Sequence, residues 1–180
     1  LCILGLFVYT NYIRKSLYLS YIASEGGNQY LVRNLPDKKA AANYLDDISN
    51  SLKQLVNSVK DKKKDGVDRL FKNFDADNIT ENIPGSTYNA YSVNKGEELS
   101  ICIREKKTEK FIDRNTIMFV AIHELSHTMS IDMGHTKEFW DNMKYLLNEA
   151  SKLGIYTPVN YSQNPVMYCG MKIDNTPLNL

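Results

Sequence analysis

The 180-residue sequence lacks an excess of charge of either sign, because 22 lysines and arginines balance 21 aspartates and glutamates. Overall charge therefore gives no attraction to nucleic acid or to acidic membranes, and we expect no nucleic-acid partner. Apolar residues, by contrast, make up 43% of the chain. A chain of this length and composition is expected to fold as one main globular domain rather than to stay disordered.

Cysteine is also scarce. The chain has three cysteines, Cys2, Cys102 and Cys169, and no two of them form a CxxC pair. This excludes a zinc ribbon and argues against a framework of several disulfides. One bridge can form between Cys102 and Cys169, but three free thiols are the favoured interpretation.

No apolar run reaches the roughly 20 residues that span a bilayer, and the first residues come closest. Residues 1–9 carry no charge, and the apolar character continues to Ile13, before Arg14 and Lys15. An apolar run followed by a basic pair is typical of the end of a transmembrane helix. We therefore predict that residues 1–24 are a membrane-anchor helix and a juxtamembrane segment of a single-pass membrane protein. A buried N-terminal helix is the alternative.

The middle of the chain has helical and then alternating patterns. Apolar residues recur at helical spacing over residues 37–60, so residues 25–65 are predicted to be a linker and a long amphipathic helix that acts as a stalk. Alternation over 88–93 and 99–104, around an Asn-Lys-Gly-Glu turn, predicts a β-hairpin.

Two further helices and a tail are expected after this hairpin. A buried helix should begin after Asp113 and end near Ser130, and an amphipathic helix should cover 136–153. The stretch after Gly154, with three prolines, is expected to be irregular and packed on the surface.

All three histidines fall within thirteen consecutive residues. His123 and His127 frame an HExxH motif, and residues four apart on a helix project from one face, so both imidazoles can bind one metal ion. The spacing suits Zn²⁺, which in a catalytic site takes three protein ligands and a water molecule. His135 is the preferred third ligand, because Gly134 lets the chain turn back toward the metal. Glu149, on the next helix, is the alternative.

Glu124 follows the first histidine and is predicted to be the general base rather than a ligand. It can take a proton from the zinc-bound water, whose pKa the metal lowers toward about 7, and pass it to the leaving amine. The motif therefore predicts a zinc-dependent metallopeptidase that acts on a peptide or protein substrate.

The segment 123–127, followed by Gly-His at 134–135 and Phe-Trp at 139–140, resembles the WLM and SprT-like group of zincin metallopeptidases. The resemblance covers roughly residues 86–153. It implies an α+β fold, in which a zincin-like domain over 66–180 has a small β-sheet or hairpin and an HExxH active-site helix. It also implies the same three histidine ligands and the same glutamate base, with the Phe-Trp pair packed under the site.

The C-terminal stretch 156–177, together with the apolar N-terminus, resembles WLM-like proteins encoded by large nucleocytoplasmic DNA viruses. This resemblance implies a membrane-anchored viral protein, located in the infected cell or in the inner membrane of the virion. The first hypothesis is therefore a membrane-anchored metallopeptidase. The alternative is a structural virion protein, such as a minor capsid protein, that anchors the inner membrane to viral capsid proteins with little or no catalysis.

Three further features are candidates for a role at this site. Tyr161 and Tyr168 can donate a hydrogen bond to the oxyanion of a tetrahedral intermediate, although packing is the favoured role for both. Cys169 can act as an inhibitory thiolate ligand of the metal. The strand at 99–104 can offer an edge to an extended peptide, as the zincin resemblance suggests.

Overall fold

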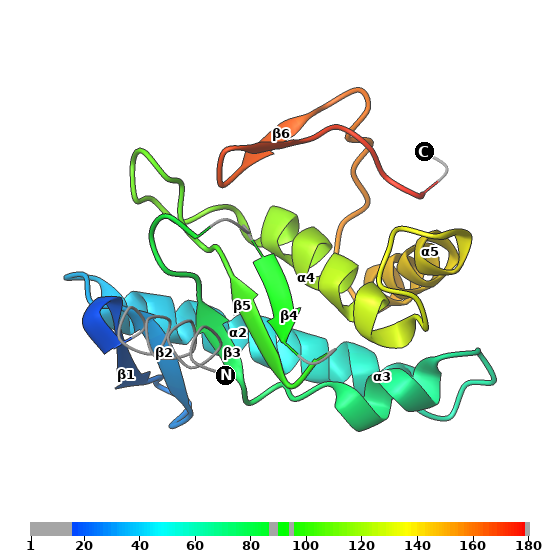
Figure 1. Ribbon diagram of the computed structural model, residues 1–180, viewed down its shortest axis with the longest axis horizontal. Helices are drawn as coiled ribbons and strands as arrows, with labels where there is room; N and C mark the ends of the chain where they lie inside the picture. The colour runs from blue at the N-terminus through cyan, green and yellow to red at the C-terminus, as the bar shows by residue number, and fades with distance from the viewer. Residues whose placement is uncertain (1–15, 87–89, 94–95, 179–180) are drawn as a thin grey trace, which may run out of the picture.

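The computed structural model describes residues 16–86, 90–93 and 96–178. Figure 1 shows a mixed sheet with helices packed against it and a separate C-terminal hairpin. The elements follow in the order β1 (Leu19–Ala23), β2 (Gln29–Arg33), α2 (Lys38–Val59), α3 (Val67–Asn73), β3 (Ile79–Glu81), β4 (Ala90–Val93), β5 (Glu98–Ile101), α4 (Arg114–Met129), α5 (Lys137–Lys152), β6 (Val166–Tyr168) and β7 (Met171–Ile173).

The main sheet has five strands in the order β1-β2-β3-β5-β4. Strands β4 and β5 pair antiparallel, with Tyr91 opposite Ser100, so the predicted hairpin is confirmed. Strand β5 also pairs parallel with β3. The prediction that 99–104 offers an edge is therefore wrong, since β5 is an inner strand. Within the described residues, β4 is the edge strand on this side.

Helix α2 is the predicted long amphipathic helix, and it is packed rather than free. It contacts β1, β2 and β3 as well as α4 and α5. Its buried stripe is fully inaccessible to solvent at Ala41, Ala42, Leu45, Ile48, Leu52, Leu55 and Val59. Burial of a leucine or isoleucine side chain contributes about 1.5–3 kcal/mol, so this helix is held mainly by the core it helps to form.

The predicted N-terminal organisation needs correction. Strand β1 pairs with β2 in the same sheet, and α2 belongs to the same hydrophobic core as α4. Residues 19–65 are therefore part of the domain, rather than a separate segment, a linker and a stalk outside it. None of the helices within the described residues combines the length and the hydrophobicity that a transmembrane span requires. The apolar run 1–13, on which the transmembrane prediction rests, lies outside the described residues.

The C-terminal stretch was expected to be irregular, but it contains an antiparallel hairpin. Strands β6 and β7 pair with Tyr168 opposite Met171. The two residues between them, Cys169 and Gly170, have φ angles of 49° and 84°. Two consecutive positive φ angles are what a tight type I′ turn requires, and glycine adopts the second without strain.

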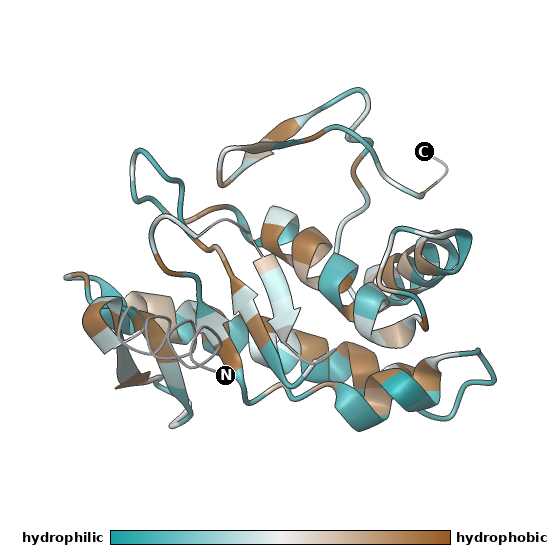
Figure 2. Ribbon diagram, viewed as in Figure 1, coloured by the Kyte–Doolittle hydropathy of each residue, from teal (hydrophilic) through white to brown (hydrophobic). Residues whose placement is uncertain are grey.

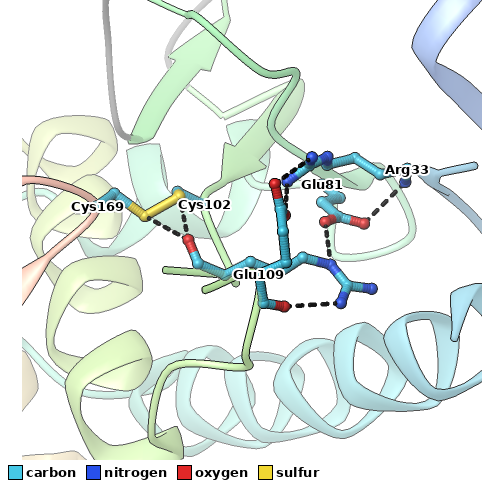
Figure 3. The surroundings of a disulfide bond; sticks show 6 residues. Arg33, Glu81, Cys102, Glu109 and Cys169 are labelled. Carbon is cyan, nitrogen blue, oxygen red and sulfur yellow. Dashed lines mark hydrogen bonds and ion pairs between the residues drawn. A yellow bond between two sulfur atoms is a disulfide. The ribbon is translucent and has the colours of Figure 1, made fainter. Parts of the chain in front are cut away.

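A disulfide joins this hairpin to the residue that follows β5. It links Cys102 to Cys169, with their Cα atoms 6.5 Å apart (Figure 3). The favoured interpretation of free thiols is therefore wrong for these two residues. The sulfur of Cys169 is also not available as a ligand of the metal. Cys2 lies outside the described residues.

Candidate metal centre

The HExxH motif lies on α4, whose sequence explains its central position. The Asp113 carboxylate caps the helix by accepting a hydrogen bond of 2.9 Å from the backbone N–H of Thr116. Ile117, Met118, Ala121 and Ile122 are fully buried, as the apolar pattern predicts. Along the helix, apolar turns give way to hydrophilic turns (Figure 2). The core also holds the second half of α4, where Leu125 and Met129 are buried beside the histidines of the motif.

The three histidines are brought together. The ring centroids of His123 and His127 are 5.0 Å apart, and each lies 4.9 Å from the ring centroid of His135. The Nε2 atoms of His123 and His135 are separated by 3.0 Å. One ring nitrogen from each residue can be chosen so that all three lie within 4.8 Å of one another.

This donor set fits a zinc ion. Tetrahedral coordination with Zn–N bonds of about 2.0–2.1 Å places ligand nitrogens about 3.3 Å apart, which is close to the 3.0 Å between the Nε2 atoms of His123 and His135. The predicted alternative ligand, Glu149, is elsewhere: its carboxylate is bound to Lys62 and Lys152. His135 is therefore the third member of the cluster, and Glu149 is not.

The turn that returns His135 to the helix is braced by contacts from other elements. The backbone N–H of Ile131 donates to the Glu138 carboxylate at 3.1 Å, and that carboxylate also pairs with Arg69 of α3. Arg69 in turn donates to the carbonyl of Met129 at 2.9 Å. This brace is not visible in the sequence, because no local pattern connects Arg69 to Met129, 60 residues later.

Gly134 does not have the role expected of it. A Cβ added there would meet nothing within 4 Å, and the residue is not among those with a positive φ angle. The turn therefore does not depend on the conformational freedom of glycine.

Phe139 forms the floor of the cluster. It is fully buried, and its ring centroid lies 4.8, 4.4 and 4.6 Å from those of His123, His127 and His135. Trp140 flanks His135 at 5.6 Å and stays 40% exposed. The position under the site that the family resemblance implied is confirmed for Phe139, whereas Trp140 lies at the side of the cluster.

Burial sets the protonation of the site. It lowers the pKa of His123 to about 3, with smaller effects from His127 and His135. This imidazole is therefore neutral at physiological pH, which is the form that binds metals. Burial also raises the pKa of Glu124 to about 7. A carboxyl group with such a pKa can both accept and return a proton near neutral pH.

The two tyrosines considered for the oxyanion are in the core. Tyr161 is 1% exposed and packs against Phe119 at 4.7 Å between ring centroids, and Tyr168 is fully buried. This burial favours packing as the role of both.

Comparison with known proteins shows the family to which the chain belongs. A profile of the WLM domain matches residues 26–173. The uncharacterized protein R325 of Acanthamoeba polyphaga mimivirus is 32% identical over 162 residues, which cover 86% of this chain and 82% of that protein. The uncharacterized protein 136R of Invertebrate iridescent virus 6 is 36% identical over 69 residues, or 37% of this chain and 38% of that protein. The resemblance to WLM proteins of large DNA viruses is confirmed.

Two solved structures share the fold. Wss1 from Saccharomyces cerevisiae superposes with a TM-score of 0.54 at 21% identity, covering 68% of this chain and 87% of that chain. Wss1 from S. pombe gives a TM-score of 0.50 at 22% identity, covering 68% and 91%. The predicted α+β class is confirmed.

Proposed function

The chain belongs to the WLM domain family, and on this basis we propose that it is a zinc-dependent metallopeptidase with Glu124 as its general base. One observation carries the proposal: three imidazoles surround a single point, and the carboxylate that follows the first of them in sequence has a pKa raised to about 7. Any one of these groups alone would be unremarkable, whereas together they provide both halves of a hydrolytic site.

Each residue of the site has a separate task. The rings of His123, His127 and His135 hold the metal, and Phe139 keeps water from their buried side. A zinc ion bound there would polarise the substrate carbonyl and make the attacking water more acidic. The Glu124 carboxylate accepts the proton of that water and then donates it to the leaving nitrogen.

The substrate that fits this arrangement is an extended peptide. Strand β4 is the edge strand of the sheet on this side and contacts α4, which carries the motif. A peptide that pairs with β4 by main-chain hydrogen bonds would therefore run along the metal helix. This proposal replaces β5 with β4 as the strand that aligns the substrate.

The test is the isosteric variant Glu124→Gln, which keeps the size of the side chain and removes the base. The purified, zinc-loaded variant should keep its zinc but lose hydrolysis of an unfolded protein substrate by about 100-fold or more. Glu25→Gln, a matched change at an exposed glutamate, should leave the rate unchanged. Full activity of Glu124→Gln would refute the mechanism.

The same assay addresses the structural alternative. A virion protein that only joins the inner membrane to the capsid would show no hydrolysis in the wild-type chain under any condition. Membrane anchoring by residues 1–24 and contact with capsid proteins stay predictions, which fractionation of infected cells and virions would test.

A further inference from the structure

We propose that the Cys102–Cys169 disulfide is a redox-sensitive lock, which fastens hairpin β6–β7 together with the segment that follows it and which a dithiol reductant opens. The effect of the lock on hydrolysis rests on the function proposed above. The release of the hairpin does not, and it can be measured separately.

Apart from the disulfide, the hairpin is attached by the packing of Val166, Tyr168 and Ile173 against the hydrophobic core. It forms a two-stranded sheet separate from the five-stranded one, and in Figure 1 it stands apart from that sheet in orange and red. Isolated two-stranded hairpins are at best marginally stable in water. Tyr168 and Ile173 are its buried side chains besides the disulfide, whereas Met167 and Met171 are about half exposed. Its position therefore depends strongly on the covalent bond.

Cys102 is the anchor point on the other side. Its sulfur is bonded to Cys169, and its backbone forms a hydrogen bond to the hydroxyl of Tyr168. Both sulfurs also contact the carbonyl oxygen of Arg104, at 3.2 Å from Cys102 Sγ and 3.3 Å from Cys169 Sγ (Figure 3). Two consecutive residues of the hairpin, Tyr168 and Cys169, are thus attached to Cys102.

The segment that carries Cys102 is itself firmly held. The Arg104 guanidinium pairs with Glu81 of β3 at 2.8 Å, and both side chains are at least 98% buried. It also pairs with Asp37, which precedes α2, at 2.6 Å. Figure 3 shows the neighbouring Arg33 and Glu109 that continue this charged cluster beside the disulfide. When the bond breaks, the sheet side stays in place and the hairpin is the part that moves.

The segment that follows β7 lies beside the metal centre. Asn175, Thr176 and Pro177 line one pocket together with Trp140, Asp141 and Lys144 of α5. The ring centroid of Trp140 lies 5.6 Å from that of His135. Release of the hairpin therefore also frees the segment that lies against the flank of the histidine cluster.

The redox step balances with a dithiol as the reductant. Cys102 is partly exposed and Cys169 is fully buried, so the dithiol thiolate attacks the Cys102 sulfur and Cys169 leaves as a thiolate that takes up a proton. The second thiol of the reductant then attacks the reductant sulfur of the mixed disulfide, which releases Cys102 as a thiol. Two electrons and two protons pass to the protein, and the dithiol becomes a disulfide.

Hydrogen exchange of the full-length protein tests the release directly. Amides of residues 166–173 should exchange about tenfold or more faster after dithiothreitol has freed two additional thiols per chain, while the amides of α2 stay protected. The double variant Cys102→Ala/Cys169→Ala should show the fast exchange with or without dithiothreitol. Unchanged exchange in the fully reduced wild-type chain would overturn the proposal.

Hydrolysis provides the second measurement. Reduction should lower kcat/KM of the zinc-loaded wild-type chain by about tenfold, and reoxidation should restore it. The double variant, treated in parallel, should not respond, which separates hairpin release from any removal of zinc by dithiothreitol. If the oxidised chain hydrolyses no substrate, the proposed function fails. The hydrogen-exchange measurement still shows whether reduction releases the hairpin. Release of the hairpin without a change in kcat/KM would refute its link to the metal centre.

Discussion

Phe139 lies 4.4 Å from His127 between ring centroids, with their planes inclined by 33°, so a residue of α5 supports a metal-binding ring of α4. Phe139 also contacts the other two imidazoles, so its single side chain packs against the whole cluster. The site therefore depends on how α4 and α5 pack, not only on the HExxH spacing.

The first prediction concerns this floor. Phe139→Ala should lower the free energy of unfolding by about 3–5 kcal/mol, because it removes a fully buried ring and leaves a cavity. Zinc affinity should fall as well, since the imidazoles lose their common support. Phe71→Ala is the matched control: Phe71 is 41% exposed, so its loss should cost far less and leave zinc binding intact. Urea unfolding and a zinc-competition titration measure the two effects.

The second prediction separates the two candidates for the third ligand. His135→Ala should weaken zinc binding by at least about 100-fold, because the ion loses one of three protein ligands. Glu149→Gln should leave zinc affinity unchanged, since Glu149 pairs with Lys62 and Lys152 instead. Competition with a chromophoric chelator gives both affinities. The reverse ranking would show that the histidine cluster is not the binding site.

The sequence predicted the local parts of this site well. Helix α4, its Asp113 cap and the convergence of the histidines follow from patterns that extend over a few turns. The packing of the Phe-Trp pair against the histidines could be predicted only from the family resemblance.

Contacts between distant residues could not be predicted in the same way. Strand β2 pairs with β3, with Leu31 opposite Thr80. No pattern in either segment indicates that the two strands are neighbours. The disulfide has the same character, with 67 residues between its cysteines. Strand β1 was hidden for another reason: its apolar residues follow the apolar N-terminus and were interpreted with it.

The third prediction uses the buried pair of Arg104 and Glu81. Arg104→Met should lower the free energy of unfolding by about 3–5 kcal/mol, because it leaves the Glu81 carboxylate buried without its partner. Lys137→Ala breaks the exposed pair with Asp141 and should cost less than about 0.5 kcal/mol. Thermal and urea unfolding at neutral pH compare the two. An equal loss of unfolding free energy in the two variants would mean that water reaches the Glu81 carboxylate in Arg104→Met.

The last prediction follows from the pKa of Glu124 in the metal-free protein. The folded pKa of about 7 lies above the reference value of 4.5, so the folded state binds this proton more tightly than the unfolded state does. Wild-type stability is therefore favoured at low pH and is lost as the pH rises through this window. Glutamine does not titrate, so Glu124→Gln should gain about 3 kcal/mol relative to wild type between about pH 4.5 and pH 7.5.

Urea unfolding in the presence of a chelator measures this difference at each pH. Below about pH 4.5 the two proteins should keep a constant difference in stability, which serves as the internal control. Curves that run parallel across the whole range would show that the Glu124 carboxyl is solvated in the folded chain. In that case burial would not raise the pKa of the Glu124 carboxyl. A raised pKa in the active protein would then have to come from another charge in the site.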